Sequence, residues 1–224
     1  MQAQTHEPTT YRRVSPYNPA RHEITPYQLF DMARSRRSAL RGANEKDFII
    51  LSFVDMNRNP MLRQSWFNCI TAWCSGDINH VELSFPSTDV TATVTLSNGS
   101  RSVTGKIFRD HYVHFLIEVG AKKEAAARAL LMDGSMGREY DMCGLFDGMC
   151  CGWCSCENPE RETCNKLVVR MLQQSRIISD SMEYSTPQQL FNAVLHGADS
   201  WHGYRTWFIE PLYEGKNAYG IELL

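Results

Sequence analysis

The sequence has 224 residues, of which 43% are hydrophobic and 21% charged, and its formal net charge is -2. This length supports one domain with a substantial core, or one domain with a tail, and the composition excludes a wholly disordered or collagen-like chain. The near-neutral charge gives no overall attraction to nucleic acid, so we expect no nucleic-acid partner.

Signals for export or membrane insertion are missing from the sequence. No run approaches the roughly 18 apolar residues that a membrane-spanning helix needs, and the start, MQAQTHEPTTYRR, lacks the apolar segment of a signal peptide. We therefore expect a soluble intracellular protein without a transmembrane segment, cytoplasmic or virion-associated. Its eight cysteines are then expected to be reduced.

Residues 1–45 are predicted to form an N-terminal extension that is partly disordered or helical. Prolines are scattered through it, and no apolar period is sustained. It ends in a basic run that is typical of a solvated tail or of a contact with a phosphate or acidic surface: Arg34, Arg36, Arg37 and Arg41. We expect the core to survive removal of residues 1–40. The domain itself is expected at 46–224, because the apolar run FIILSFV after Asp47 predicts a buried strand.

A helix and four strands are predicted next. Pro60 favours a helix start, and Ser75-Gly76 favours its end. The four strands are predicted to form an antiparallel meander with a turn at 97–100: HVELSF, VTATVTL, SVTGKIF and HYVHFLIEV.

The last third of the chain predicts three helices and a strand. The segment 121–134 suits a helix with an i,i+4 pair of Glu124 and Arg128 and with Gly134 as its stop. ETCNKLVVRMLQ and TPQQLFNAVL suit helices capped by Thr163 and Thr186, and GYRTWFIEPLY a final strand.

Cys164 and His80 are the candidates for nucleophilic catalysis. A helix N-terminus stabilises a thiolate and offers N–H donors for an oxyanion, and Cys164 stands there if Thr163 caps its helix. His80 opens a predicted strand beside a loop, where an imidazole can face that thiol.

Five short motifs occur in an order that resembles one known family. They are Lys46-Asp47-Phe48-Ile49-Ile50-Leu51, His80-Val81-Glu82-Leu83, Gly137-Arg138-Glu139-Tyr140-Asp141, Cys164-Asn165-Lys166-Leu167-Val168 and Thr186-Pro187-Gln188-Gln189-Leu190. This order resembles the circularly permuted branch of the NlpC/P60 superfamily of papain-like cysteine hydrolases, which includes YiiX-like bacterial proteins and poxviral relatives. The resemblance implies an α+β papain-like core in which the nucleophile-bearing helix packs against an antiparallel sheet.

The resemblance also implies the roles of individual residues. Cys164 would be the nucleophile, His80 the base, and a polar residue on the following strand would orient the imidazole. That strand has no acid and offers only hydroxyls, with Thr93 as one candidate. Glu82, two residues after His80, points to the same strand face and is the other candidate. Lys166 is not a substitute base, because an ordinary ammonium with a pKa of about 10.4 is a poor base at neutral pH.

The implied activity is that of a thiol-dependent hydrolase or acyltransferase without a cofactor. It would cleave or transfer an amide, isopeptide, thioester or ester bond of a peptide, protein or lipid acyl substrate. The missing acid on the following strand favours an alternative, a catalytically weak or inactive binding or virion-associated protein that keeps the fold.

A cluster of four cysteines carries a second hypothesis. Cys150, Cys151, Cys154 and Cys156 contain a Cys-x-x-Cys pair, which is typical of structural zinc, but adjacent cysteines and the lack of a second pair argue against it. Palmitoylation or packing of the loop explains the cluster as well. Cys69 and Cys74 fall in the predicted helix and suit a core role. His111 and His114 would face opposite sides of a strand, so they are expected to be structural, and no metal site is predicted.

Overall fold

The computed structural model describes residues 24–58, 76–109, 111–132, 136–141, 160–197, 201, 203–209 and, for the backbone alone, 222–223. Two predicted features lie outside these ranges. One is the helix after Pro60, with Cys69 and Cys74, and the other is the cysteine segment 150–156.

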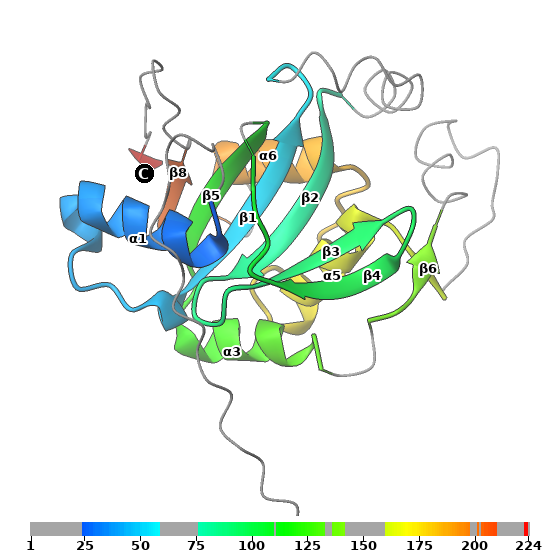
Figure 1. The fold of residues 1–224 in the computed structure, drawn as a ribbon, viewed down its shortest axis with the longest axis horizontal. Helices are drawn as coiled ribbons and strands as arrows, with labels where there is room; N and C mark the ends of the chain where they lie inside the picture. The colour runs from blue at the N-terminus through cyan, green and yellow to red at the C-terminus, as the bar shows by residue number, and fades with distance from the viewer. Residues whose placement is uncertain are drawn as a thin grey trace, which may run out of the picture.

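One antiparallel sheet organises the described chain (Figure 1). Its order is β4-β3-β2-β1-β5-β8-β9. The strands are β1 (Phe48–Asp55), β2 (Ile78–Phe85), β3 (Val90–Thr95), β4 (Gly99–Thr104), β5 (Tyr112–Glu118), β8 (Thr206–Ile209) and β9 (Glu222–Leu223). A separate parallel pair joins β6 (Glu139–Tyr140) to β7 (Arg161–Glu162). The apolar run FIILSFV forms the central strand β1, where side chains on both faces can be buried.

The predicted meander is confirmed for three strands and wrong for the fourth. β2, β3 and β4 are neighbours in chain order, but β5 pairs with β1 on the opposite side of the sheet. β4 ends at Thr104 because Gly105 takes a left-handed conformation with φ +63°, which turns the chain out of the sheet. The following connection crosses the face of β1 and β2 before β5 begins (Figure 1). Lys106 to Phe108, predicted as strand, therefore lie on that face.

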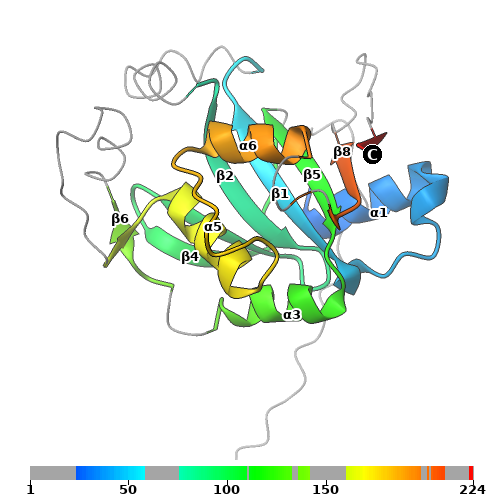
Figure 2. The ribbon, with the colours of Figure 1, turned by 180° about the vertical axis from the view of Figure 1, so that it is seen from behind.

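Of the helices in the described part of the chain, three cover one face of the sheet and a fourth covers the other. Figure 2 shows α3 (Ala121–Ala129), α5 (Cys164–Gln174) and α6 (Pro187–Leu195) in front of the sheet, whereas α1 (Pro26–Arg36) lies behind it. Two single 3₁₀ turns, Ser38–Leu40 and Glu45–Asp47, connect α1 to β1. Together these elements confirm the α+β class.

The predicted helix caps are confirmed. The Thr163 hydroxyl accepts the Lys166 N–H at 3.2 Å, and the Thr186 hydroxyl accepts the Gln189 N–H at the same distance. Each hydroxyl satisfies a backbone donor that the first helical turn leaves unpaired, which fixes where the helix begins.

The helix over 121–134 is shorter than predicted. α3 ends at Ala129, and Gly134 lies outside the described residues. The Arg128 Nε–Glu124 Oε1 ion pair forms at 3.3 Å.

The N-terminal segment requires a correction. Pro26–Arg36 is helical, one of the two forms predicted, but the described part of residues 1–45 does not lie outside the core. Its apolar side chains Ile24, Leu29, Phe30, Ala33 and Leu40 are buried in a cluster with the β1 side chains Phe48 and Ile50, Leu116 of β5 and Trp207 of β8. The pattern was missed because only three of these apolar residues lie within one short helix. The core therefore has two parts, one on each face of the sheet.

Within the described ranges, no helix is both long enough and apolar enough to cross a membrane.

Candidate active site

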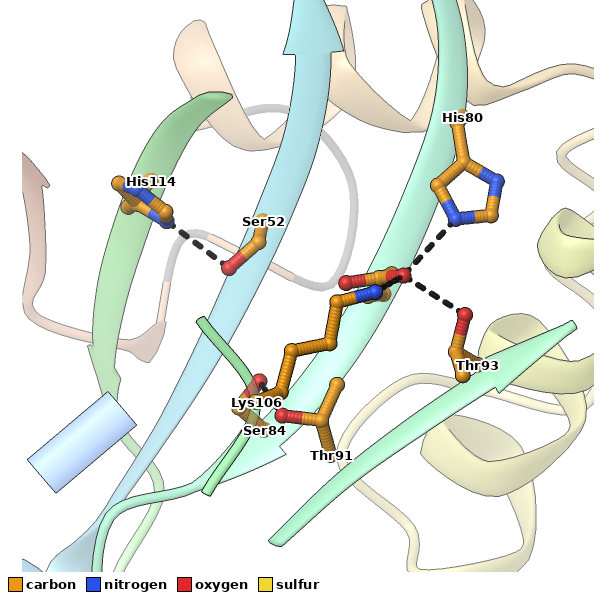
Figure 3. A network of polar contacts seen from close by, with 8 residues as sticks. Ser52, His80, Ser84, Thr91, Thr93, Lys106 and His114 are labelled. Carbon is orange, nitrogen blue, oxygen red and sulfur yellow. Dashed lines mark hydrogen bonds and ion pairs between the residues drawn. The ribbon is translucent and has the colours of Figure 1, made fainter. Parts of the chain in front are cut away.

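The site lies where β3 separates from β2. The two strands pair from Phe85↔Val90 to Leu83↔Ala92, and the pairing stops there. The first half of β2, which carries His80, continues along β1, while the second half of β3 continues along β4. Figure 3 shows the two strands diverging beside the His80 ring. The N-terminus of α5 reaches this opening.

Cys164 is the first residue of α5, and its side chain is buried. A hydrogen bond joins its thiol to the His80 imidazole, and the backbone N–H groups of Val81 and Asn165 donate to its sulfur. Val81 lies in the part of β2 that does not pair with β3. Its N–H donates to the Cys164 sulfur and not to a neighbouring strand on that edge. The helix cap and the strand separation together explain why this sulfur has backbone donors from two elements.

Glu82 completes a line from the sulfur through the imidazole to a carboxylate. The His80 Nε2–Glu82 Oε1 distance is 3.0 Å, and the Glu82 side chain is fully buried. Because the two residues are two apart on one strand, their side chains share a face, as predicted. Nε2 faces the carboxylate, and Nδ1 lies on another edge of the ring (Figure 3).

Two further side chains bind the same carboxylate oxygen. The Thr93 hydroxyl donates to Glu82 Oε1 at 2.6 Å, and the Lys106 ammonium forms an ion pair with it (Figure 3). Thr93, the alternative candidate for orienting the imidazole, therefore contacts the carboxylate that contacts the ring. The structure brings together all four predicted site residues: Cys164, His80, Glu82 and Thr93.

Cys164, His80, Glu82 and Lys106 form a cluster of ionisable side chains, and its electrostatics favour the ionised forms. Burial alone would lower the pKa of His80, but the charges of Cys164 and Glu82 and the hydrogen bonds to both raise it to about 10. Burial would raise the pKa of Glu82, but the hydrogen bond and charge of His80, followed by those of Lys106, lower it to about 2. Burial also acts to raise the pKa of the Cys164 thiol, and His80 with the two backbone donors lowers it. A thiolate and an imidazolium are the expected forms at neutral pH.

Sequence reasoning missed Lys106. It lies in the connection after β4, 24 residues beyond Glu82, within a run that was predicted as strand. The contact of Lys106 with Glu82 could not be predicted, because no neighbouring residue indicates that the chain crosses the sheet and returns to β2.

The Gly137–Asp141 motif lies beside α5. Asp141 is buried, and its Oδ2 accepts the Lys166 ammonium at 3.1 Å. The charge of Cys164 acts on Tyr140, whose pKa is raised by burial and by this charge. Lys166 is thus engaged on the first turn of α5, consistent with its exclusion as the base.

No metal site is found among the described residues, and the four clustered cysteines lie outside them. His114 faces the sheet side opposite to the three helices, where its Nδ1 lies 2.9 Å from the Ser52 hydroxyl. His111 precedes β5 and packs against the Tyr112 ring. Cys164, His80 and the backbone N–H groups of Val81 and Asn165 can together supply a nucleophile, a proton carrier and oxyanion donors.

Comparisons with known proteins return no match: no family model, no curated protein and no solved structure matches this chain. The NlpC/P60 resemblance therefore stands on the five motifs alone.

Proposed function

We propose that this chain is a thiol hydrolase or acyltransferase in which Cys164 is the nucleophile, His80 carries the proton and Glu82 orients the imidazole. The observation that carries the proposal is the unbroken series of hydrogen bonds from the thiol through the imidazole to a buried carboxylate. A nucleophile, its base and an orienting third group in this relation are the recurring arrangement of nucleophilic catalysis.

The reaction follows from the ionised pair. The Cys164 thiolate attacks the carbonyl carbon, and the electron pair of the C=O bond moves to oxygen. The N–H groups of Asn165 and Val81, which point at the sulfur, are the nearest backbone donors for this oxyanion. When the tetrahedral intermediate collapses, the His80 imidazolium gives its proton to the leaving amine, alcohol or thiol. Water, or another acceptor, then attacks the acyl-cysteine while His80 takes its proton. Collapse of this second tetrahedral intermediate breaks the C–S bond, which releases the acyl product and restores the thiolate.

The substrate class follows only from the resemblance. The candidate substrates are amide, isopeptide, thioester and ester bonds of peptides, proteins or lipid acyl groups. A fold alone does not distinguish among these substrates. The alternative of an inactive binding or virion-associated protein drew its support from the missing acid on the strand after His80. The contact between Glu82 and His80 removes that argument, because a carboxylate reaches the ring from the same strand.

Brief alkylation followed by peptide mapping tests the proposal. Iodoacetamide should modify Cys164 before the other cysteines at neutral pH, and His80→Ala should slow this labelling at least about tenfold, since one unit of pKa changes the thiolate fraction about tenfold. His196→Ala, a change at an exposed histidine after α6, is the matched control and should leave the rate unchanged. Protection of Cys164 until the protein is denatured would remove the basis for an enzyme.

A further inference from the structure

The ion pair between Lys106 and Glu82 points to a role for a residue outside the predicted triad. We infer that Lys106 is a positioning residue whose ammonium balances the buried charge of Glu82, so that the His80 imidazolium remains the counter-ion of the Cys164 thiolate. The inference rests on the proposed function and adds a residue to its machinery.

The contact geometry places Lys106 on the inner side of the cluster. Its ammonium meets Glu82 Oε1, the oxygen that also faces His80, and its side chain is only 19% exposed while that of Glu82 is fully buried. The ammonium also lies 5.9 Å from the centre of the Tyr112 ring, a cation–π distance. A lysine held on two sides in this way has lost most of its freedom to leave the carboxylate.

The backbone on both sides of Lys106 is fixed as well. Gly105 N–H donates to the Asp89 carbonyl at 2.7 Å, and Phe108 exchanges two backbone hydrogen bonds with Ile24, at 2.8 and 3.1 Å. The segment is therefore tied to the β2–β3 turn at one end and to Ile24, two residues before α1, at the other. The backbone hydrogen bonds on both sides of Lys106 therefore hold this residue beside Glu82.

Charge balance gives the reason for a lysine. The ionised cluster holds two buried anions, Glu82 and Cys164, and two cations, His80 and Lys106. Without the ammonium, one imidazolium would face two buried anions. A buried charge without a partner is costly, so one of the anions would take up a proton more readily.

Neighbouring titratable groups do not take over this role. Tyr112 and Tyr140 have pKa values raised by burial and by nearby anions, and the pKa of His114 is lowered by burial to about 3, so all three are neutral at pH 7. Arg109 acts electrostatically on the Tyr112 hydroxyl.

Two other cations near the site are bound to carboxylates of their own. Lys166 pairs with Asp141 on the α5 side, and Arg58 pairs with Asp55 at the end of β1. Among the lysines and arginines of the described part of the chain, Lys106 is the one that contacts Glu82.

The pH profile of Cys164 alkylation tests this inference. Lys106→Met should move the acidic limb of the profile upward by about one pH unit, so that labelling at a pH on that limb slows about tenfold, because the site has lost one of its two balancing cations. Lys106→Arg keeps the charge and should keep the wild-type profile. Lys123→Met is the control, because Lys123 contacts the Tyr204 hydroxyl and ring instead of the cluster. If Lys106→Met does not fold, Lys106→Gln, which keeps a donor without the charge, takes its place.

The outcomes separate the two proposals. An unchanged profile in Lys106→Met, with a reactive wild-type Cys164, would overturn the role of Lys106 and leave the thiol–imidazole pair standing. Equal shifts in Lys106→Met and Lys106→Arg would also overturn it, since charge would then not be the cause. An unreactive Cys164 in the wild-type protein would instead overturn the proposed function itself.

Discussion

A single carboxylate oxygen holds the site together at the residue scale. Glu82 Oε1 meets His80 Nε2, the Thr93 hydroxyl and the Lys106 ammonium, whereas Oε2 is buried without a hydrogen-bond partner among the described residues. Because every one of these donors meets Oε1, this one atom links the imidazole to Thr93 and Lys106. The three donors come from β2, β3 and the connection after β4, so the contact between Glu82 and His80 depends on how these three segments pack.

Replacing Glu82 should affect Cys164 more than replacing Thr93. Glu82→Gln keeps the shape but removes the charge that holds the imidazolium, so we expect labelling of Cys164 at neutral pH to fall about tenfold or more. Thr93→Val removes one neutral donor and should lower the rate only by about two- to fivefold, in line with a hydrogen bond worth about 0.5–1 kcal/mol. Alkylation rates of both variants, measured with their circular dichroism spectra, give the comparison. Equal rates in Glu82→Gln and the wild-type protein would show that the carboxylate does not act on the ring.

Part of this cluster could be predicted from the sequence. The two-residue spacing of His80 and Glu82 on a strand puts both side chains on one face, and a threonine before Cys164 marks a helix start. That Thr93 contacts the carboxylate and not the ring depends on where β3 leaves β2, which no local pattern encodes. Lys106 depends on the path of a connection across the sheet, so residue spacing could not reveal it.

At the scale of elements, the sheet carries a row of buried polar side chains on the face opposite to the three helices. Ser52 of β1 lies directly between Glu82 of β2 and His114 of β5 in the strand register. His114 is fully buried, its Nδ1 is hydrogen-bonded to Ser52, and its ring packs against those of Phe108 and Tyr112. This row extends from the candidate site to the core beneath α1.

His114 should make the stability of the protein depend on pH. Burial lowers its pKa from 6.5 to about 3, so below pH 6.5 the unfolded chain binds a proton that the folded chain does not. The free energy of unfolding should therefore fall as the pH is lowered from 6.5 toward 3, by up to about 1.4 kcal/mol per pH unit. His114→Gln should flatten this dependence between pH 6.5 and 4.5. Urea unfolding at several pH values measures the slope.

Glu82 and His80, the titratable partners in the candidate site, affect the free energy of unfolding in other pH ranges. The stabilisation from Glu82 is complete above pH 4.5 and is lost as the pH falls to about 2, and that from His80 is complete below pH 6.5 and is lost as the pH rises through about 10. The window from 6.5 to 4.5 thus isolates His114 from both. Identical slopes for His114→Gln and the wild-type protein in this window would mean that the buried imidazole is protonated in the folded state.

The helices with local sequence signals were predicted well, but the order of the strands in the sheet was not. Caps and apolar periods located α5 and α6, because these signals lie within one turn of the helix end. The position of β5 beside β1 could not be deduced in the same way. Strand order depends on contacts between distant segments, and consecutive strands with short turns favour a meander until a connection such as 105–109 leaves the plane.

At the scale of the whole molecule, the sheet is enclosed between α1 on one face and α3, α5 and α6 on the other (Figures 1 and 2). The sequence held one indirect sign of this arrangement. FIILSFV is apolar at every position but Ser52, so both faces of β1 needed a cover, and one cover had to come from outside the three predicted helices. The short apolar set around α1 lacked the sustained period that would have identified it.

The N-terminal segment is therefore expected to be integral to the fold. Phe30 is fully buried against Phe48, with ring centres 5.3 Å apart, so Phe30→Ala should lower the free energy of unfolding by about 3–5 kcal/mol. Tyr27→Ala, a change at an exposed side chain of the same helix, should change it by no more than about 0.5 kcal/mol. Denaturant unfolding of the two variants gives both values.

Removal of residues 1–40 should have a larger effect than either substitution. It uncovers the apolar side chains of β1, β5 and β8 beneath α1, and it takes away Ile24, whose backbone pairs with Phe108 two residues from Lys106. We expect a protein that is insoluble or melts far below the full chain, and in any soluble fraction Cys164 should react with iodoacetamide more slowly, because the segment that delivers Lys106 has lost its anchor. A truncated protein with the melting temperature and Cys164 reactivity of the full chain would show that the cover over this face contributes neither to the core nor to the site.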